Sequence, residues 1–145
     1  SPYTGGDYFT STTKVEKIGA SQKMYLDKII DLCAEKDIKV ILFSVPSPLT
    51  CTMAKHNAVA AYAADRGLTF LDLNMIVSDL GIDWTNDTYD KGDHLNFAGA
   101  VKVTAYIGKY LSDSKLLPDR RGDSAYSAWD DRLKTYMSLT GITAA

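Results

Sequence analysis

Two short apolar runs constrain the fold of this chain more than any other feature of its sequence. They lie at 40–45 and 68–73, and turn residues bound them, with Pro46 closing the first and Gly67 preceding the second. A short apolar run between turn residues is typical of a strand that is buried on both faces of a parallel sheet. We therefore predict a strand of this kind at 40–45, and a second strand at 68–73.

Helical patterns alternate with these two runs. Apolar residues recur at helical spacing over 21–36, with Ser21 as the expected N-cap, and again over 54–66, where Gly67 supplies the stop. The resulting order is helix, strand, helix, strand with short connections. That order predicts a right-handed βαβ crossover in an α/β sheet.

The second half of the chain contributes helices and one long connection. A helix is predicted over 97–112, and a last amphipathic stretch carries apolar residues at Trp129, Leu133, Tyr136 and Met137. We expect that stretch to dock on its own core, with the missing half of the domain or a neighbouring molecule as the alternative. The connection over 74–96 has no periodicity, and a structureless loop of that length in a compact domain is usually functional.

The domain organisation follows from these elements. We expect an N-terminal arm at 1–20, an α/β domain at 21–117 and a helical tail at 118–145. Two strands are fewer than the roughly four to six of a typical sheet. We therefore favour a chain that is part of a larger sheet, over a small self-contained α+β unit.

Composition excludes several classes of function. The formal net charge is −2, so no broad basic surface favours nucleic acid or an anionic membrane. No run approaches the roughly 18 apolar residues of a membrane span. Cys33 and Cys51 are too few for a disulfide framework, although one bridge stays open. The chain opens on Ser1 without a signal peptide, so we expect a processed product or an expressed fragment.

The densest group of polar residues lies at 89–96, immediately before the helix predicted at 97–112. An aspartate such as Asp90 can hold one imidazole nitrogen of His94, which leaves the other nitrogen free to take a proton. Loops at the carboxyl ends of strands are where α/β sheets gather their sites. The alternative is that His94 caps or packs under the helix while the aspartates are solvated.

The stretch 90–100 resembles the last motif of the SGNH (GDSL-like) hydrolases, in which Asp-Xaa-Xaa-His-Xaa-Asn-Xaa-Xaa-Gly precedes a final helix. It is most similar to the membrane-anchored branch found on bacterial surfaces, and the resemblance covers about 21–112. The family's Asp position holds Lys91 here, so we take Asp90 as the residue that orients His94, with Asp93 as the alternative. Adjacent side chains diverge in an extended loop, which favours Asp90 over Asp93.

The resemblance implies an incomplete α/β domain, a three-layer flavodoxin-like SGNH fold that is represented by its C-terminal half. The family's serine block and oxyanion donors are not recognisable, and the Gly122-Asp123-Ser124 tripeptide follows the last core helix rather than a strand. We expect the isolated chain to be inert or weakly active. A missing N-terminal half or a companion chain would supply the serine.

The complete protein is then expected to be an esterase or O-acyltransferase that acts on acylated cell-envelope glycans or small esters at the extracytoplasmic bacterial surface. The mechanism would be of the Ser-His-Asp type, without a metal or another cofactor. No nucleic acid and no membrane contact by this chain itself is expected. The alternative is a non-catalytic module that uses the same half-fold to bind glycan or to assemble with a partner.

Several other residues are candidates for a site. Trp84 and Asn96 are candidate substrate contacts, because a tryptophan can stack on a sugar ring. Cys51 with His56 could form a nucleophile pair, but a semi-buried loop thiol is the expected reading.

Three further readings are weaker still. Ser44 and Ser47 could offer a hydroxyl, although serines beside prolines usually serve turns. The two histidines and the aspartates lack metal-ligand spacing. Arg121-Gly122-Asp123 spells an integrin-binding tripeptide but fits loop chemistry better.

Overall fold

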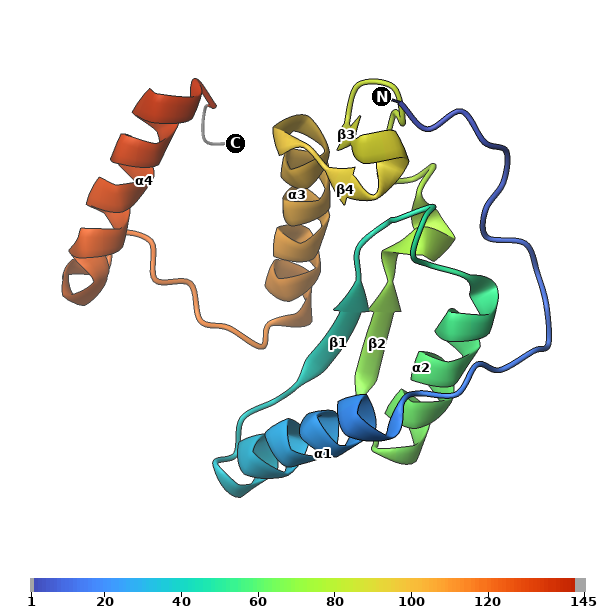
Figure 1. Cartoon of the computed structure of the whole chain (residues 1–145). Coiled ribbons are helices and arrows are strands. Elements are labelled where there is room, and N and C mark those ends of the chain that lie inside the picture. Colours follow the sequence, from blue (N-terminus) through green and yellow to red (C-terminus); the bar gives the residue numbers. More distant parts are fainter. Residues whose placement is uncertain (1, 143–145) are drawn as a thin grey trace. The chain divides into compact units, whose positions relative to one another are not determined.

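The computed structural model describes residues 2–142, which form two compact units that divide between Ile107 and Gly108 (Figure 1). The first unit is a mixed α/β arrangement. It begins with an arm that has no regular element, followed in chain order by α1 (Ala20–Glu35), β1 (Ile41–Ser44), α2 (Met53–Asp65) and β2 (Thr69–Asp72). The four elements confirm the predicted helix, strand, helix, strand order.

The two strands pair in parallel, as predicted. Ile41 is opposite Thr69 and Ser44 is opposite Asp72, and α2 forms the crossover between the strands (Figure 1). The prediction that the strand at 40–45 is buried on both faces is wrong, because Phe43 in β1 is 53% exposed. Within the described residues β1 has only β2 as a neighbour, so its other edge is free.

The ends of the helices follow local side-chain chemistry. The expected cap at Ser21 is wrong: α1 begins one residue earlier, with Gly19 at the N-cap and no side-chain cap bond. At α2 the Thr52 hydroxyl accepts a hydrogen bond from the Lys55 N–H at 3.2 Å, the usual N-cap bond. Gly67 follows α2 with a φ of +65°, which confirms it as the stop.

The long connection is not structureless, which corrects the sequence reading. It contains the 3₁₀ turns η1 (Leu73–Ile76) and η2 (Asp90–Gly92), and the antiparallel strands β3 (Thr88–Tyr89) and β4 (His94–Leu95). These two strands form a hairpin in which Tyr89 is opposite His94. Strands of two residues are too short to leave a period-2 pattern, so the sequence did not reveal them.

The hairpin leads into α3 (Phe97–Ser114), which confirms the predicted helix and continues into the second unit. Val103 of α3 packs with Leu73 and Leu80 in the core of the first unit. Gly99 lies so close to the Asp87 carbonyl oxygen that a Cβ there would clash. This close approach fixes the start of α3 against the connection that carries Asp90 and His94.

The second unit contains η3 (Ser124–Tyr126) and α4 (Ser127–Thr140), which confirms a helix in the tail. The Asp123 carboxylate accepts the Ala125 N–H at 3.0 Å and so caps η3. Asp119 forms an ion pair with Arg121 at 2.6 Å. Both charged residues of the Arg121-Gly122-Asp123 tripeptide thus serve the local turn.

The structure also bears on the cysteines and on the question of a membrane-spanning helix. Cys33 and Cys51 are both free thiols, so the bridge that the sequence left open is not formed. Over residues 2–142, no helix combines the length and the apolar character that crossing a membrane requires.

Candidate functional site

The β3–β4 hairpin brings together the aspartate and the histidine that the sequence singled out. The Asp90 Oδ2 lies 2.8 Å from the His94 Nδ1, and its Oδ1 accepts the backbone N–H of His94 at 3.0 Å. One carboxylate thus holds both the ring and the backbone of the histidine. With the proton on Nδ1, the Nε2 atom is left as an acceptor for a further proton.

The electrostatics of this pair follow from the hydrogen bond. The Asp90 carboxylate raises the pKa of His94 above its ordinary value of 6.5, first by accepting the hydrogen bond and then by its charge. The same bond lowers the pKa of Asp90 below 3.8. Both side chains are largely exposed, at 71% for His94 and 52% for Asp90, so water screens the pair.

Asp93 is the second carboxylate beside the imidazole. Its Oδ2 lies 3.8 Å from the His94 Nδ1, which is farther than the Asp90 oxygen. Its Oδ1 instead accepts the Ser47 hydroxyl at 3.1 Å, and the Thr50 hydroxyl donates to the Ser47 Oγ at 2.7 Å. Asp93 therefore adds negative charge near the ring, while Asp90 makes the orienting bond.

These three side chains also have the spacing of a cation site. Asp90, Asp93 and His94 each offer a ligand atom, and these atoms lie within 4.8 Å of one another. Carboxylate and imidazole suit a divalent cation, but the Nδ1 of His94 would have to exchange its Asp90 partner for the ion. His56, which the sequence considered for such a site, belongs to a different cluster.

An apolar trough of about 660 Å³ opens beside His94. Its polar lining includes Ser47, Thr50, Asp93 and His94. Its apolar wall comes from β1, the segment that follows it, β4 and α3: Phe43, Val45, Pro46, Leu95, Ala100, Val103 and Ile107, with Thr104 beside them. The His94 side chain therefore shares one cavity with apolar residues of β1, β4 and α3.

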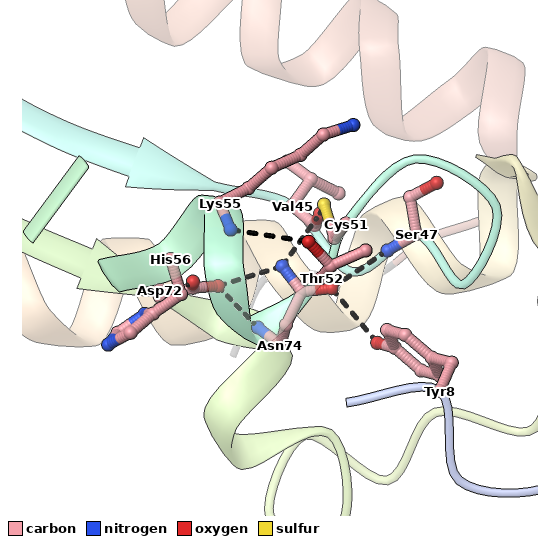
Figure 2. Close-up of polar contacts among 9 residues, drawn as sticks. All are labelled: Tyr8, Val45, Ser47, Cys51, Thr52, Lys55, His56, Asp72 and Asn74. Atoms are coloured by element: carbon pink, nitrogen blue, oxygen red, sulfur yellow. Dashed lines mark hydrogen bonds and ion pairs between the residues drawn. The ribbon is translucent and has the colours of Figure 1, made fainter. Parts of the chain in front are cut away.

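A buried hydrogen-bond network anchors the segment that carries Ser47 (Figure 2). The Asn74 Oδ1 accepts the Ser47 backbone N–H at 3.0 Å and the Tyr8 hydroxyl at 2.9 Å. The Asn74 Nδ2 donates to the Asp72 Oδ1 at 2.7 Å and to the Val45 carbonyl at 3.4 Å. One amide thus joins the ends of both strands and the N-terminal arm.

His56 joins this network through Asp72. Its Nδ1 lies 2.7 Å from the Oδ2 of the buried Asp72 side chain, and its ring centroid lies 6.0 Å from that of Phe9 and 5.6 Å from that of Phe70. Cys51 instead contacts the Val45 carbonyl through its Sγ, at 3.8 Å. Figure 2 shows the two side chains apart, with Cys51 near Val45 and His56 next to Asp72. The structure does not bring Cys51 and His56 together as a nucleophile pair.

Trp84 and Asn96, the two candidate substrate contacts, both interact with other residues of the protein. Trp84 packs edge-on against Tyr3 and Tyr8, with ring centroids 5.9 Å and 5.6 Å away. The Asn96 Nδ2 donates to the Asn86 carbonyl at 2.7 Å, while its Oδ1 accepts the Gly99 N–H at 3.2 Å. The second bond is of the N-cap type and satisfies a free donor at the start of α3.

None of the candidate serines forms a hydrogen bond with the His94 imidazole. Ser44 ends β1 opposite Asp72, and Ser47 donates to a carboxylate instead of to His94. Ser124 begins η3 in the second unit. Along the described part of the chain, no hydroxyl group forms a hydrogen bond with the His94 ring.

Sequence reasoning missed the role of Asn74. The sequence does contain a signal for it: Asp72 near the end of the second predicted strand and Asn74 two residues later give the apolar run a polar end. Such residues gather where parallel strands end and loops turn. The long-range partners Tyr8 and Ser47 left no trace in local spacing.

Comparisons with known proteins found no relative of this chain. No family model matches the chain, and no match was found among curated proteins or solved structures. Any function therefore has to be argued from the resemblance to the SGNH motif at 90–100 and from the geometry of the site.

Proposed function

We propose that this chain is the base-carrying part of an SGNH-like acyl-transfer site, an esterase or O-acyltransferase of the Ser-His-Asp type. One observation carries the proposal: the 2.8 Å bond from Asp90 to the His94 Nδ1, which leaves Nε2 free beside an apolar trough. A histidine held in one tautomer by a carboxylate, with the other nitrogen accessible, is the arrangement that a general base needs.

The chemistry of this site is a two-step acyl transfer. His94 Nε2 takes the proton from a serine hydroxyl as the serine oxygen attacks an ester carbonyl, and Asp90 stabilises the imidazolium that forms. The imidazolium returns the proton to the leaving alkoxide when the ester C–O bond breaks. Water or a sugar hydroxyl then attacks the acyl-serine, with His94 again taking and returning the proton.

The serine would come from a strand that pairs in parallel with the free edge of β1. Two parallel strands are few for a stable sheet, and the unpaired backbone of an edge strand accepts a further strand. Phe43 and Val45 are both exposed and both line the trough. The carboxyl end of β1 leads to Ser47, near Asp93, so a parallel neighbour would also end close to His94.

The substrate class comes from the motif resemblance. We propose an acylated cell-envelope glycan and a place at the extracytoplasmic bacterial surface, within the three-layer flavodoxin-like fold of which this chain would form the C-terminal half. No further cofactor is required, because proton transfer and acyl transfer to serine are chemistry that side chains perform.

A second candidate is a module that binds glycan or assembles with a partner without catalysis. The observation that favours it is that, among the described residues, no hydroxyl group forms a hydrogen bond with the His94 ring. The two candidates differ in one requirement, because only the enzyme needs a serine next to Nε2.

Acetate release from an acetylated oligosaccharide tests the proposal, using the full-length product of the gene that encodes this chain. We expect His94→Ala to abolish turnover while the far-UV circular dichroism is unchanged. His56→Gln is the matched control, because His56 also pairs with an aspartate but lies in the other cluster. Turnover that persists in His94→Ala would refute the role of His94.

A further inference from the structure

The tail helix α4 carries an uncovered apolar strip (Figure 1). The strip begins at the N-cap residue and continues at intervals of three or four residues, so that each side chain neighbours the next along the helix: Tyr126, Trp129, Leu133, Tyr136 and Leu139. All five side chains are exposed, Trp129 by 66% and Leu139 by 81%. A continuous exposed apolar surface of this kind marks a place where another molecule binds.

The helix itself needs such a partner. α4 has 14 residues and buries none of its side chains. Isolated helices shorter than about 12–15 residues are marginal in water, and most of the stability of a helix in a protein comes from the packing of its apolar face. The helix α1 differs, because it buries Ile30. The strip is therefore the surface through which α4 gains its packing.

The second unit also contains a hollow that apolar side chains can fill. The hollow has a volume of about 450 Å³. Its lining residues are Arg120, Arg121, Tyr126, Trp129, Asp130 and Leu133. It thus lies at the N-terminal half of the strip, whereas Tyr136 and Leu139 are exposed at the C-terminal half. One surface carries both a hollow and the kind of side chain that fills it.

We propose that α4 binds α4 of a second copy of this chain, as an antiparallel pair around a twofold axis. An interface with twofold symmetry uses the same patch on both copies, so the patch has to be complementary to itself. The antiparallel arrangement places Tyr136 and Leu139 of each copy over the hollow of the other copy. This pairing is independent of the proposed acyl transfer, because α4 contributes no residue to the trough beside His94.

The charges of α4 favour the antiparallel arrangement over a parallel one. All charged residues of the helix lie between Asp130 and Lys134, and the segment 135–140 is uncharged. In an antiparallel pair the charged part of each copy therefore faces the uncharged part of the other, whereas a parallel pair would place like charges side by side, which is costly. The last turn of α4 holds no basic residue, so the negative end of its dipole would meet the arginines at the hollow of the other copy.

The size of the strip suits a reversible dimer. With about 200 Å² for a complete large side chain, the exposed parts of the five side chains amount to about 550 Å². Two copies would bury about 1,100 Å², close to the roughly 1,200 Å² at which stable interfaces begin and above the roughly 800 Å² of most crystal contacts. We therefore expect a dissociation constant of about 10–100 µM.

Sedimentation velocity of the full-length gene product, over about 1–500 µM, tests the pairing. Trp129→Glu and Leu139→Glu should each raise the dissociation constant more than tenfold, because each places a charge in the apolar contact. Leu139 is 81% exposed, so its substitution should leave the monomer intact, and far-UV circular dichroism checks this. Tyr25→Glu is the matched control, because Tyr25 is 62% exposed on α1 and should leave the dimer unchanged.

A cross-linking experiment tests the direction of the two helices. In a background of Cys33→Ser and Cys51→Ser, a bismaleimide should link a copy with Ala128→Cys to a copy with Thr140→Cys more readily than it links either copy to itself. Preferred linkage between identical copies would show a parallel pair and overturn the antiparallel arrangement.

Three results would overturn the dimer itself. They are a monomer at about 500 µM, a dimer that neither α4 substitution weakens, and a dimer that Tyr25→Glu abolishes. A monomer in which Trp129 is shielded from acrylamide quenching would show that α4 packs on its own chain instead.

Discussion

Removing the Asn74 side chain should be among the most destabilising single changes to the first unit. Asn74→Ala deletes the two bonds to the Asn74 Oδ1, from Ser47 N–H at 3.0 Å and the Tyr8 hydroxyl at 2.9 Å. It also deletes the 2.7 Å bond from Nδ2 to Asp72. Ser47 is only 6% exposed, so water cannot readily replace its lost partner.

The size of the effect follows from these bonds. A neutral hydrogen bond contributes about 1 kcal/mol net, and one to a charged group about 2 kcal/mol. The two neutral bonds and the carboxylate bond together predict a loss of about 3–4 kcal/mol in the free energy of unfolding. That is a large part of the roughly 5–15 kcal/mol that a domain has in total. Tyr8→Phe removes only one of these bonds and should cost about 1 kcal/mol.

Urea unfolding measures the loss. Trp84 reports on the first unit because its ring lies 5.6 Å from that of Tyr8, and a Trp129→Phe background removes the signal of the second unit. Asn57→Ala is the control, since Asn57 Nδ2 donates to two backbone carbonyls in exposed positions, each at 2.9 Å. A loss for Asn74→Ala no larger than that for Asn57→Ala would refute the reasoning.

Three further predictions follow from the hairpin and α3. In an NMR titration, Asp90→Asn should lower the pKa of His94 more than Asp93→Asn does, because Asp90 makes the hydrogen bond; the reverse order would show that Asp93 orients the ring. The Asp90–His94 pair should stabilise the fold fully between pH 3.8 and pH 6.5. This stabilisation should be lost as pH rises through the raised pKa of His94 or falls through the lowered pKa of Asp90. A difference in urea midpoint between wild type and Asp90→Asn that is the same at pH 5 and at pH 9 would contradict this. Gly99→Ala should lower the free energy of unfolding, measured with urea, by about 1–3 kcal/mol, because the new Cβ would meet the Asp87 carbonyl. Gly108→Ala in the same helix has open space around the new Cβ and should raise that free energy by up to about 1 kcal/mol. Equal effects of the two substitutions would refute the close approach at Gly99.

The sequence was sufficient for the order and type of the long elements. The apolar runs that became β1 and β2, and the helical spacing of α1, α2 and α3, are periodic over enough residues to be read. The burial of β1 could not be read in the same way, because a run of apolar residues does not say whether a neighbouring strand is present. Phe43 is apolar in sequence yet 53% exposed in the structure.

The site was predicted only where its residues are close in sequence. Asp90 and His94 are four residues apart, so their pairing could be proposed from spacing. Their hairpin could not, since it depends on left-handed backbone at Asp90 and Lys91, which few residues other than glycine adopt. The bond from Ser47 to Asp93 spans 46 residues and follows from tertiary packing.

Fluorophosphonate labelling, followed by peptide mass spectrometry, tests the central claim most directly: that His94 serves as base to a serine from outside these 145 residues. The full-length gene product and its His94→Ala variant are labelled side by side, with any companion chain present. The account predicts a labelled serine outside residues 1–145 whose labelling is lost in His94→Ala. Label on a serine within this chain, such as Ser47 beside the trough, or labelling that is indifferent to His94, would contradict it.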